Sequence, residues 1–250
     1  MNFSGVSRKT LYGRALRWPL RLIPKRAELR VLQGSLRGKS WIAGSFNHGC
    51  WLGSYEYDKR RLFEQTVREA TTVFDIGAHV GFYTLLGSVL VGPGGRVYAF
   101  EPLPRNLWYL REHIRINGIK NATVVEVAVS DRTGQATFDI RPSNSMGHLA
   151  TDGDLEVRTV TLDDFVYSDG GPVPDYLKVD VEGSELGVLA GAESLLRRRH
   201  PIIFLATHGS AVNEECCRFL RSLAYDLRPI GGQANEIIAS PRLVRTQCGC

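Results

Sequence analysis

The sequence predicts one α/β domain built on a doubly wound, mostly parallel sheet. Short apolar β-branched segments alternate with amphipathic helical segments from about residue 58 to 223. A glycine turn, Gly77 to Gly81, directly follows the first of these strands. Acidic residues follow several strands, at the carboxyl ends where such sheets bind ligands. A chain of 250 residues can bury one core of this size.

The first core strand is expected over residues 72–76, because these are mostly apolar and β-branched. The next helix is indicated by apolar residues at helical spacing: Phe82, Leu85, Leu86, Val89 and Leu90. A glycine turn between strand and helix lets a ligand approach the backbone, since glycine has no side chain and tolerates positive φ. The turn therefore predicts a nucleotide-type site.

The other elements follow from periodicity and from Gly, Pro and Asn breaks. Short strands forming a small cap are expected over residues 28–57, and a helix over 58–70. Core strands are expected at 96–100, 122–127, 175–179 and 201–206, and further helices at 103–117 and 213–223. A hairpin-like insertion with a loop at 143–154 is expected over 134–166, and a terminal antiparallel pair at 225–229 and 236–240.

The spacing of the glycines and acids selects the ligand. Dinucleotide-binding turns place glycines at relative positions 0, 2 and 5, whereas Gly77 and Gly81 are four apart. Asp75 precedes the turn and would repel a pyrophosphate but suit a cation. Glu101 ends the next strand, where its carboxylate can accept hydrogen bonds from two ribose hydroxyls. These features favour S-adenosylmethionine, which carries a sulfonium and an ammonium and no phosphate.

Five motifs carry a resemblance to a known family. DIGAHVG and YAFEP resemble motifs I and II of the class I S-adenosylmethionine-dependent methyltransferases. VAVSDRTG, TLDDF and LKVDVEGSE with VLAGAESLL are similar in order and spacing to the FkbM-type O-methyltransferases. The resemblance covers roughly Trp51 to Ile230. It implies a Rossmann-like seven-stranded sheet with a C-terminal antiparallel strand, and methyl transfer to a hydroxyl of a sugar, glycolipid or polyketide-like acceptor.

Cofactor contacts are expected around three strand ends. Asp75 and Gly77 are expected at the methionyl end, directly or through water, Glu101 at the ribose, and Ser130 near the adenine. The full expected set is Asp75, Gly77, Ala78, Gly81, Phe82, Tyr83, Glu101, Pro102, Ala128, Val129, Ser130 and Asp180, with Glu56 and Trp51 closing over the cofactor. We expect two parts in the chain: a basic N-terminal extension and β cap, residues 1–66, and an S-adenosylmethionine-binding methyltransferase domain, residues 67–250.

Methyl transfer to a hydroxyl needs a base or a metal to remove the proton. The candidate catalytic residues are Asp180, Glu182 and His208. Many members of the resembled family end this strand in an acid, whereas here Ala206 and Thr207 stand before His208. Asp180, Glu182 and Glu185 could share Mg²⁺ or Ca²⁺. Alternatively, Glu185 stabilises a helix start and Asp180 contacts the amino group of the cofactor; no metal is assigned. His79 is expected to act in positioning or packing.

Residues 1–40 contain ten Lys and Arg against one acid, Glu28, in a chain of net charge +5. Interleaved apolar residues make this segment compatible with a solvated helix on the domain, with a peripheral membrane contact, or with nucleic acid. Two other functions therefore stay open: a nucleic-acid methyltransferase, although no stacking platform is evident, and a non-catalytic binding module at a membrane surface. Oligomeric state cannot be inferred from the sequence.

Cysteine usage indicates a reduced, cytoplasmic protein. The five cysteines are odd in number, and they do not resemble a disulfide framework. Cys248 and Cys250 stand near the C-terminus and are expected in a frayed tail rather than a metal or redox site. No apolar run is long enough to predict a transmembrane helix.

Overall fold

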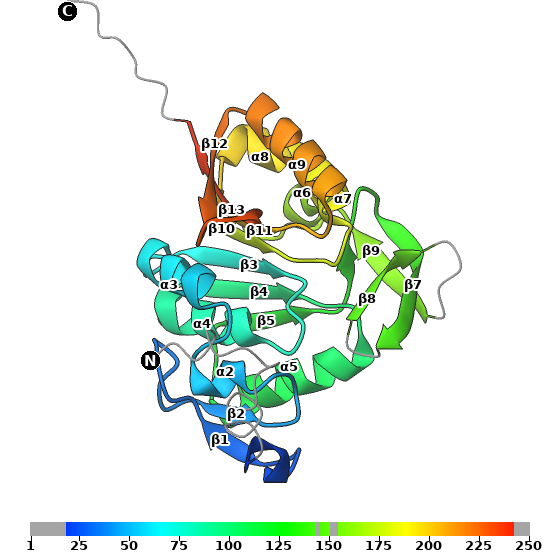
Figure 1. The fold of residues 1–250 in the computed structure, drawn as a ribbon. Helices are drawn as coiled ribbons and strands as arrows, with labels where there is room; N and C mark the ends of the chain where they lie inside the picture. The colour runs from blue at the N-terminus through cyan, green and yellow to red at the C-terminus, as the bar shows by residue number, and fades with distance from the viewer. Residues whose placement is uncertain (1–18, 144–145, 151–154, 243–250) are drawn as a thin grey trace, which may run out of the picture.

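A seven-stranded sheet forms the centre of the molecule (Figure 1). A computed structural model describes residues 19–143, 146–150 and 155–242. The strand order is β12-β13-β11-β10-β3-β4-β5, and β13 runs antiparallel to both neighbours. The strands are β3 (Thr72–Ile76), β4 (Arg96–Phe100), β5 (Ala122–Val125), β10 (Tyr176–Val179), β11 (Ile202–Ala206), β12 (Tyr225–Ile230) and β13 (Gln233–Pro241). The predicted fold class is confirmed, and the order reverses between β3 and β10, where such sheets bind ligands.

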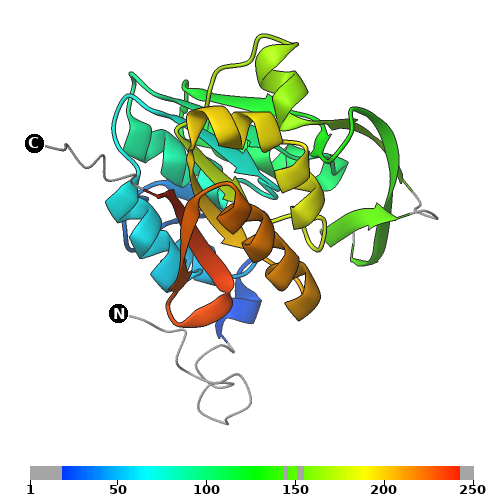
Figure 2. The same cartoon turned by 90° about the horizontal axis from the view of Figure 1, so that it is seen from above.

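Helices cover both faces of the sheet (Figures 1 and 2). One face carries α3 (Tyr57–Thr66), α4 (Phe82–Val91) and α5 (Pro104–Ile116), and the other carries α6 (Leu162–Tyr167), α7 (Glu185–Ala190), α8 (Glu193–Arg199) and α9 (Ser210–Ser222). The strands supply both cores by alternation: Phe74 and Ile76 pack toward α6–α9, whereas Val73 packs toward α3 and α4. Asp75, between Phe74 and Ile76, therefore points into the α3–α4 layer.

The cap consists of η1 (Pro19–Leu22), an antiparallel pair, β1 (Glu28–Arg30) and β2 (Ser40–Ile42), and α2 (Gly49–Leu52). The expectation of strands through residues 49–57 is wrong, because this stretch forms α2 and the start of α3. Trp41, Cys50 and Trp51 of the cap share a hydrophobic core with α3 and α4. Hydrophobic packing thus continues across the domain boundary that is expected after residue 66. That domain boundary stays a prediction. Residues 1–18 of the basic segment lie outside the described chain.

One buried histidine of α5 joins the cap to the glycine turn. His113 Nδ1 donates to the carbonyl oxygen of Val80 at 2.7 Å, and His113 Nε2 accepts from the amide of Ile42 at 3.0 Å. The imidazole stacks on Trp41 with ring centroids 4.0 Å apart. Burial lowers the pKa of His113 to about 4, so the ring is neutral at physiological pH, as this pair of bonds requires.

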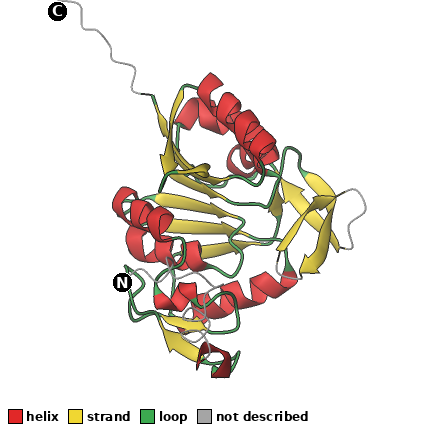
Figure 3. Ribbon diagram, viewed as in Figure 1, coloured by secondary structure: helices red, strands yellow, loops and turns green. Residues whose placement is uncertain are grey.

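The insertion forms a second sheet of order β6-β9-β7-β8, seen on the right in Figures 1 and 3. Its strands are β6 (Ala128–Val129), β7 (Gly134–Ser143), β8 (Met146–Ala150) and β9 (Leu155–Val160). The expected third strand through residue 127 ends at Val125, after which the chain enters this sheet. The predicted loop at 143–154 is corrected in part: residues 146–150 form β8, whereas 144–145 and 151–154 lie outside the described residues.

Residues 162–167, placed by the sequence at the end of the period-two insertion, form helix α6 instead. Thr161 caps this helix because its hydroxyl accepts from the amide of Asp164 at 2.9 Å. Cys50, Cys216 and Cys217 are buried free thiols, and Cys248 and Cys250 lie outside the described residues. Within the described part of the chain, no helix has the length and apolar content of a bilayer span.

Candidate active site

A cavity opens where β3, β4 and β10 end, at the reversal of strand order. Its walls come from the glycine turn, the segments after β4 and β10, the start of the insertion and two cap residues. The lining residues are Phe46, Tyr55, Gly77, Ala78, His79, Val80, Phe82, Tyr83, Phe100, Glu101, Pro102, Leu103, Asn106, Val127, Ala128, Val129, Lys178, Asp180, Val181, Glu182 and Ser184. The cavity therefore brings most of the predicted contact residues together.

The glycine turn is held tightly between the neighbouring strands. The amides of Gly77 and Ala78 both donate to the carbonyl oxygen of Phe100, at 3.1 and 3.0 Å. Gly77 has φ +73°, and a Cβ there would lie 1.9 Å from the carbonyl oxygen of Asp180. Only glycine fits, because both the backbone conformation and the close approach exclude a side chain. Gly81 does not line the cavity and begins α4 with φ +93°.

Glu101 is fixed in the cavity wall by three donors. Its Oε2 accepts from the amide of His79 at 2.7 Å, and its Oε1 accepts from the amide of Leu103 at 2.9 Å and from Asn106 Nδ2 at 3.2 Å. Burial raises the pKa of Glu101 to about 6 despite these bonds. The predicted ribose contact thus has a fixed orientation. His79 has the positioning role expected of it, through its main chain, and its ring packs against Phe46.

Asp75 lies behind the cavity wall and is fully buried. Its Oδ2 accepts from Thr84 Oγ1 at 2.6 Å, and its Oδ1 lies 3.3 Å from Lys178 Nζ. Lys178 Nζ also donates to the carbonyl oxygen of Gly77 at 2.9 Å and lines the cavity. Asp75 therefore does not line the cavity itself, and Lys178 is its partner that does. The expected contact of Asp75 with a methionyl group, direct or through water, stays a prediction.

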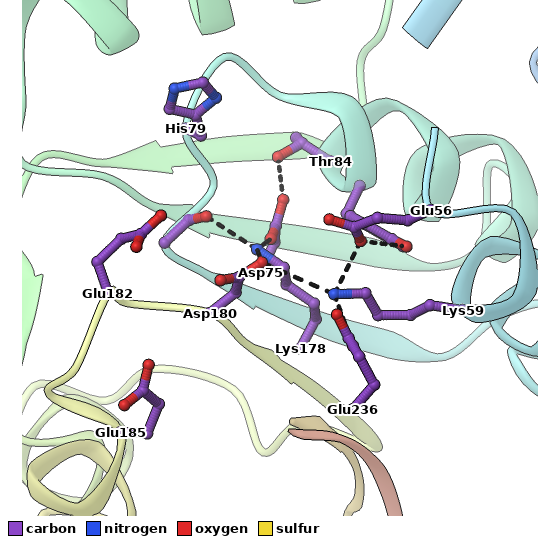
Figure 4. Close-up of polar contacts among 12 residues, drawn as sticks. Glu56, Lys59, Asp75, His79, Thr84, Lys178, Asp180, Glu182, Glu185 and Glu236 are labelled. Carbon is purple, nitrogen blue, oxygen red and sulfur yellow. Dashed lines mark hydrogen bonds and ion pairs between the residues drawn. The ribbon is translucent and has the colours of Figure 1, made fainter. Parts of the chain in front are cut away.

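A second buried lysine joins this network from α3 (Figure 4). Lys59 Nζ lies 2.8 Å from Glu56 Oε2, 2.9 Å from Glu236 Oε2 and 3.7 Å from Asp180 Oδ2. Although burial lowers the pKa of Lys59, these carboxylates raise it above its usual range. We refer to Glu56, Lys59, Asp75, Lys178, Asp180 and Glu236 as the lysine cluster.

Tyr83 packs at the centre of the lysine cluster. Its hydroxyl donates to Glu56 Oε2 at 3.0 Å, and its ring centroid lies 5.7 Å from Lys59 Nζ and 5.6 Å from Lys178 Nζ. Glu56 is thereby committed to Lys59 and Tyr83 and does not line the cavity. Tyr83 itself does line it, as predicted.

The three predicted catalytic residues meet beside the cavity. His208 Nε2 lies 3.3 Å from Glu182 Oε2 and 3.8 Å from Asp180 Oδ1, and His208 Nδ1 lies 2.7 Å from Glu185 Oε1. The hydrogen bond to Glu185 raises the pKa of His208 to about 9, and Glu182 and Asp180 act in the same direction. Burial raises the pKa of Asp180, but the positive charges of Lys178, Lys59 and His208 together lower it by more. The net pKa of Asp180 is therefore below its ordinary value.

The structure changes the set of residues that could hold a metal ion. Glu185, expected to converge with Asp180 and Glu182, is fully buried and turns to His208 and to the amide of Gly183. Ligand atoms of Asp180, Glu182 and His208 lie within 4.8 Å of one another and could hold a cation. In the structure they form an ion-pair cluster with each other.

The remaining predicted residues are placed as follows. Phe82, Pro102, Ala128 and Val129 line the cavity, whereas Ser130 is buried beside it and hydrogen bonds to Asp131. Trp51 is buried in the core of the cap and hydrogen bonds to His48. Sequence reasoning missed Phe46, Tyr55, Lys59, Lys178 and Glu236. Only Lys178 carried a local signal, because it interrupts an otherwise apolar strand.

Comparisons with known proteins place the chain among methyltransferases. The family model "Methyltransferase FkbM domain" matches residues 75–229. The chain is 30% identical over 146 residues to "Hexuronic acid methyltransferase AglP" of Haloferax volcanii, covering 57% of this chain and 58% of that protein. It is 29% identical over 161 residues to "31-O-demethyl-FK506 methyltransferase FkbM" of Streptomyces tacrolimicus, covering 51% and 61%. The matches thus span about three fifths of these relatives.

A solved structure agrees with the fold. The crystal structure of methyltransferase FkbM from Methylobacillus flagellatus superposes with a TM-score of 0.52 at 19% identity, covering 78% of this chain and 55% of that chain. At this identity the likeness supports the fold alone.

Proposed function

The chain belongs to the FkbM methyltransferase family, and from this membership we propose that it methylates a hydroxyl oxygen of a sugar-type or polyketide-type acceptor, with S-adenosylmethionine as donor. The names of two relatives support the acceptor class: one is a hexuronic acid methyltransferase, and the other is a 31-O-demethyl-FK506 methyltransferase. The observation that carries the proposal is the cavity itself, with a fixed carboxylate, Glu101, in one part of its wall and two more, Asp180 and Glu182, in another.

The residues of the cavity fit the donor. Glu101 has its carboxylate fixed by three donors and can accept hydrogen bonds from ribose hydroxyls. Ala128 and Val129 supply an apolar wall for the adenine. The carboxylate of Asp180, with its lowered pKa, stays ionised and suits the methionyl ammonium. When bound, S-adenosylmethionine supplies an electrophilic methyl group on a sulfonium.

His208 is the base that the geometry favours. Glu185 fixes the Nδ1 proton of the imidazole, which leaves Nε2 directed toward Asp180 and Glu182 at the edge of the cavity. Neutral His208 can accept the proton of the acceptor hydroxyl at Nε2 as that oxygen bonds to the methyl carbon. Base catalysis of this kind contributes about 10²- to 10⁴-fold in rate. Holding the acceptor in line can lower the barrier by a further ~7–11 kcal/mol.

Calorimetry tests donor binding. We expect S-adenosylmethionine to bind the wild type, and Glu101→Ala to weaken binding about tenfold or more, because a buried charged hydrogen-bond acceptor is lost. Glu193→Ala, which removes a half-exposed carboxylate of α8, is the matched control and should bind as the wild type does. Equal affinity in Glu101→Ala and wild type would contradict the site assignment.

Acceptors are then tested by following the demethylated donor product with a hexuronic acid, a neutral hexose and a macrolide bearing a free hydroxyl. Turnover with one of these and not with RNA supports the proposed acceptor class. Turnover with RNA alone would overturn it in favour of nucleic-acid methylation.

A further inference from the structure

Carboxylates outnumber the cations that pair with them beside the cavity. The lysine cluster contains four carboxylates, Glu56, Asp75, Asp180 and Glu236, paired with two ammonium groups. The adjoining His208 pairs with Glu182 and Glu185 and also contacts Asp180. With its acids ionised, the described network therefore carries a net negative charge.

This charge is buried and faces the cavity. The side chains of Lys59 and Lys178 are 3% and 5% exposed, and those of Asp75 and Asp180 are 1% and 20% exposed. Lys178, Asp180 and Tyr83 line the cavity, whereas Lys59, Glu56 and Glu236 do not. Figure 4 shows Lys59 between the carboxylates of Glu56 and Glu236. Buried charge is costly unless it is paired, so an excess of carboxylates favours a ligand that brings positive charge into the cavity.

We propose that the lysine cluster discriminates the methyl donor from its demethylated product by charge, with Lys59 and Glu236 setting the strength of this discrimination. The proposal rests on the proposed function. S-adenosylmethionine carries a sulfonium, an ammonium and a carboxylate, and its net charge is +1. Methyl transfer converts the sulfonium into a neutral thioether, which leaves a ligand of net charge zero. The electronegative cluster attracts the first more strongly than the second, and it thereby favours exchange of product for donor.

The ion pair between Lys59 and Glu236 provides a test that distinguishes a structural role of these residues from an effect of their charge. Neither residue lines the cavity, and their 2.9 Å contact joins α3 to β13. Lys59→Met and Glu236→Gln break the same ion pair. However, the first makes the cluster more negative and the second makes it less negative. A purely structural role predicts changes of the same sign in the two variants, whereas the charge mechanism predicts opposite signs.

The measurement is calorimetry of S-adenosylmethionine and of its demethylated product at pH 8 and low salt. The quantity compared is the ratio of the product Kd to the donor Kd. We expect Lys59→Met to raise this ratio about three- to tenfold, and Glu236→Gln to lower it by a similar factor, because charges within several ångströms interact strongly in a partly buried site. The double variant should return toward the wild-type ratio. Arg61→Met, an exposed cation of the same helix, is the control and should leave the ratio unchanged.

The possible outcomes are distinct. Ratios that move in the same direction in both variants, or that do not move, overturn the charge mechanism. Circular dichroism shows whether Lys59→Met folds. If it does not, the test rests on Glu236→Gln and the charge-preserving Glu236→Asp. The ratio of product Kd to donor Kd must then fall in Glu236→Gln and stay unchanged in Glu236→Asp. A wild type that binds neither ligand would instead refute the proposed function.

Discussion

Asp75 and Lys178 lie opposite each other on the adjacent parallel strands β3 and β10, and their side chains form an ion pair on the face covered by α3 and α4. The pair connects the glycine turn to the acidic loop after β10, because Lys178 also donates to the carbonyl oxygen of Gly77. This cross-strand ion pair thus adds a side-chain link between two walls of the cavity, beside the backbone pairing of β3 with β10.

Removing one partner of this pair should destabilise the fold. Lys178→Met leaves the Asp75 carboxylate buried without its counter-ion, and such losses cost about 3–5 kcal/mol. The double variant Lys178→Met with Asp75→Asn should recover part of this loss, since it also removes the buried charge. Urea denaturation of the wild type and the two variants measures the free energy of unfolding. A double variant less stable than Lys178→Met would contradict the pairing argument.

Turnover should rise with pH from neutrality toward about 9, because His208 must lose a proton before it can act as a base. Glu185→Gln removes the carboxylate that most raises the pKa of His208. The midpoint of the kcat profile should therefore move to lower pH, with a lower plateau because the ring is less well oriented.

The measurement is the pH dependence of kcat in wild type and Glu185→Gln, with Glu193→Gln as a surface control. An unmoved midpoint in Glu185→Gln would remove His208 from the proton-transfer step. The same assay after dialysis against EDTA tests the alternative role of this cluster. Loss of turnover that is restored by Mn²⁺ would assign Asp180, Glu182 and His208 as metal ligands instead.

His113 should make the link between cap and domain sensitive to acid. Its folded-state pKa of about 4 lies below its ordinary value of 6.5. The unfolded chain therefore binds the proton first, and the stability that neutral His113 contributes is present above pH 6.5 and lost as pH falls toward 4. A shift of this size corresponds to roughly 3 kcal/mol.

His113→Phe keeps a ring beside Trp41 but loses both hydrogen bonds, so it should be less stable than wild type at pH 7 by about 1–3 kcal/mol. The stability gap between the two proteins should narrow from pH 6.5 to 4, because only the wild type carries the depressed histidine. Denaturation at several pH values measures this gap. A gap that stays constant over this range would show that His113 is not the titrating group.

Gly77→Ala should prevent normal docking of the turn against β10, since a Cβ there meets the carbonyl oxygen of Asp180. The control is Gly118→Ala, which has a similar positive φ of +61° but open space around the added Cβ. The control measures the backbone strain alone, about 1–2 kcal/mol. Thermal unfolding should show a clearly larger loss for Gly77→Ala, and equal losses would mean that the turn can move away from β10.

The predictable part of the site is the part encoded locally. The strand, glycine turn and helix at residues 72–91 appear in the sequence as a change of period, and Glu101 is found because it directly follows the next strand. Helix α2 was missed because it has only four residues, beginning with Gly49 and followed by Gly53, which is too little sequence to show a helical period. Strand β8 was missed because its residues, Met146 to Ala150, lack the β-branched alternation of a strand.

The lysine cluster could not be predicted for a different reason. Lys59 and Glu236 meet only because α3 packs against the sheet to which β13 belongs. No local sequence pattern marks either residue. Lysine is also among the residues most often exposed. A buried Lys59 is therefore contrary to the usual expectation, and the tertiary fold that places three carboxylates around it is what makes this position possible.

The position of β13 also affects when the lysine cluster can form during synthesis of the chain. This strand inserts between β11 and β12, and it delivers Glu236 to a lysine contributed by one of the first helices. Because a ribosome releases the chain from its N-terminus, Lys59 emerges well before Glu236, its partner on β13. Nascent chains that already contain the glycine turn therefore lack one carboxylate of the lysine cluster until β13 has been synthesised.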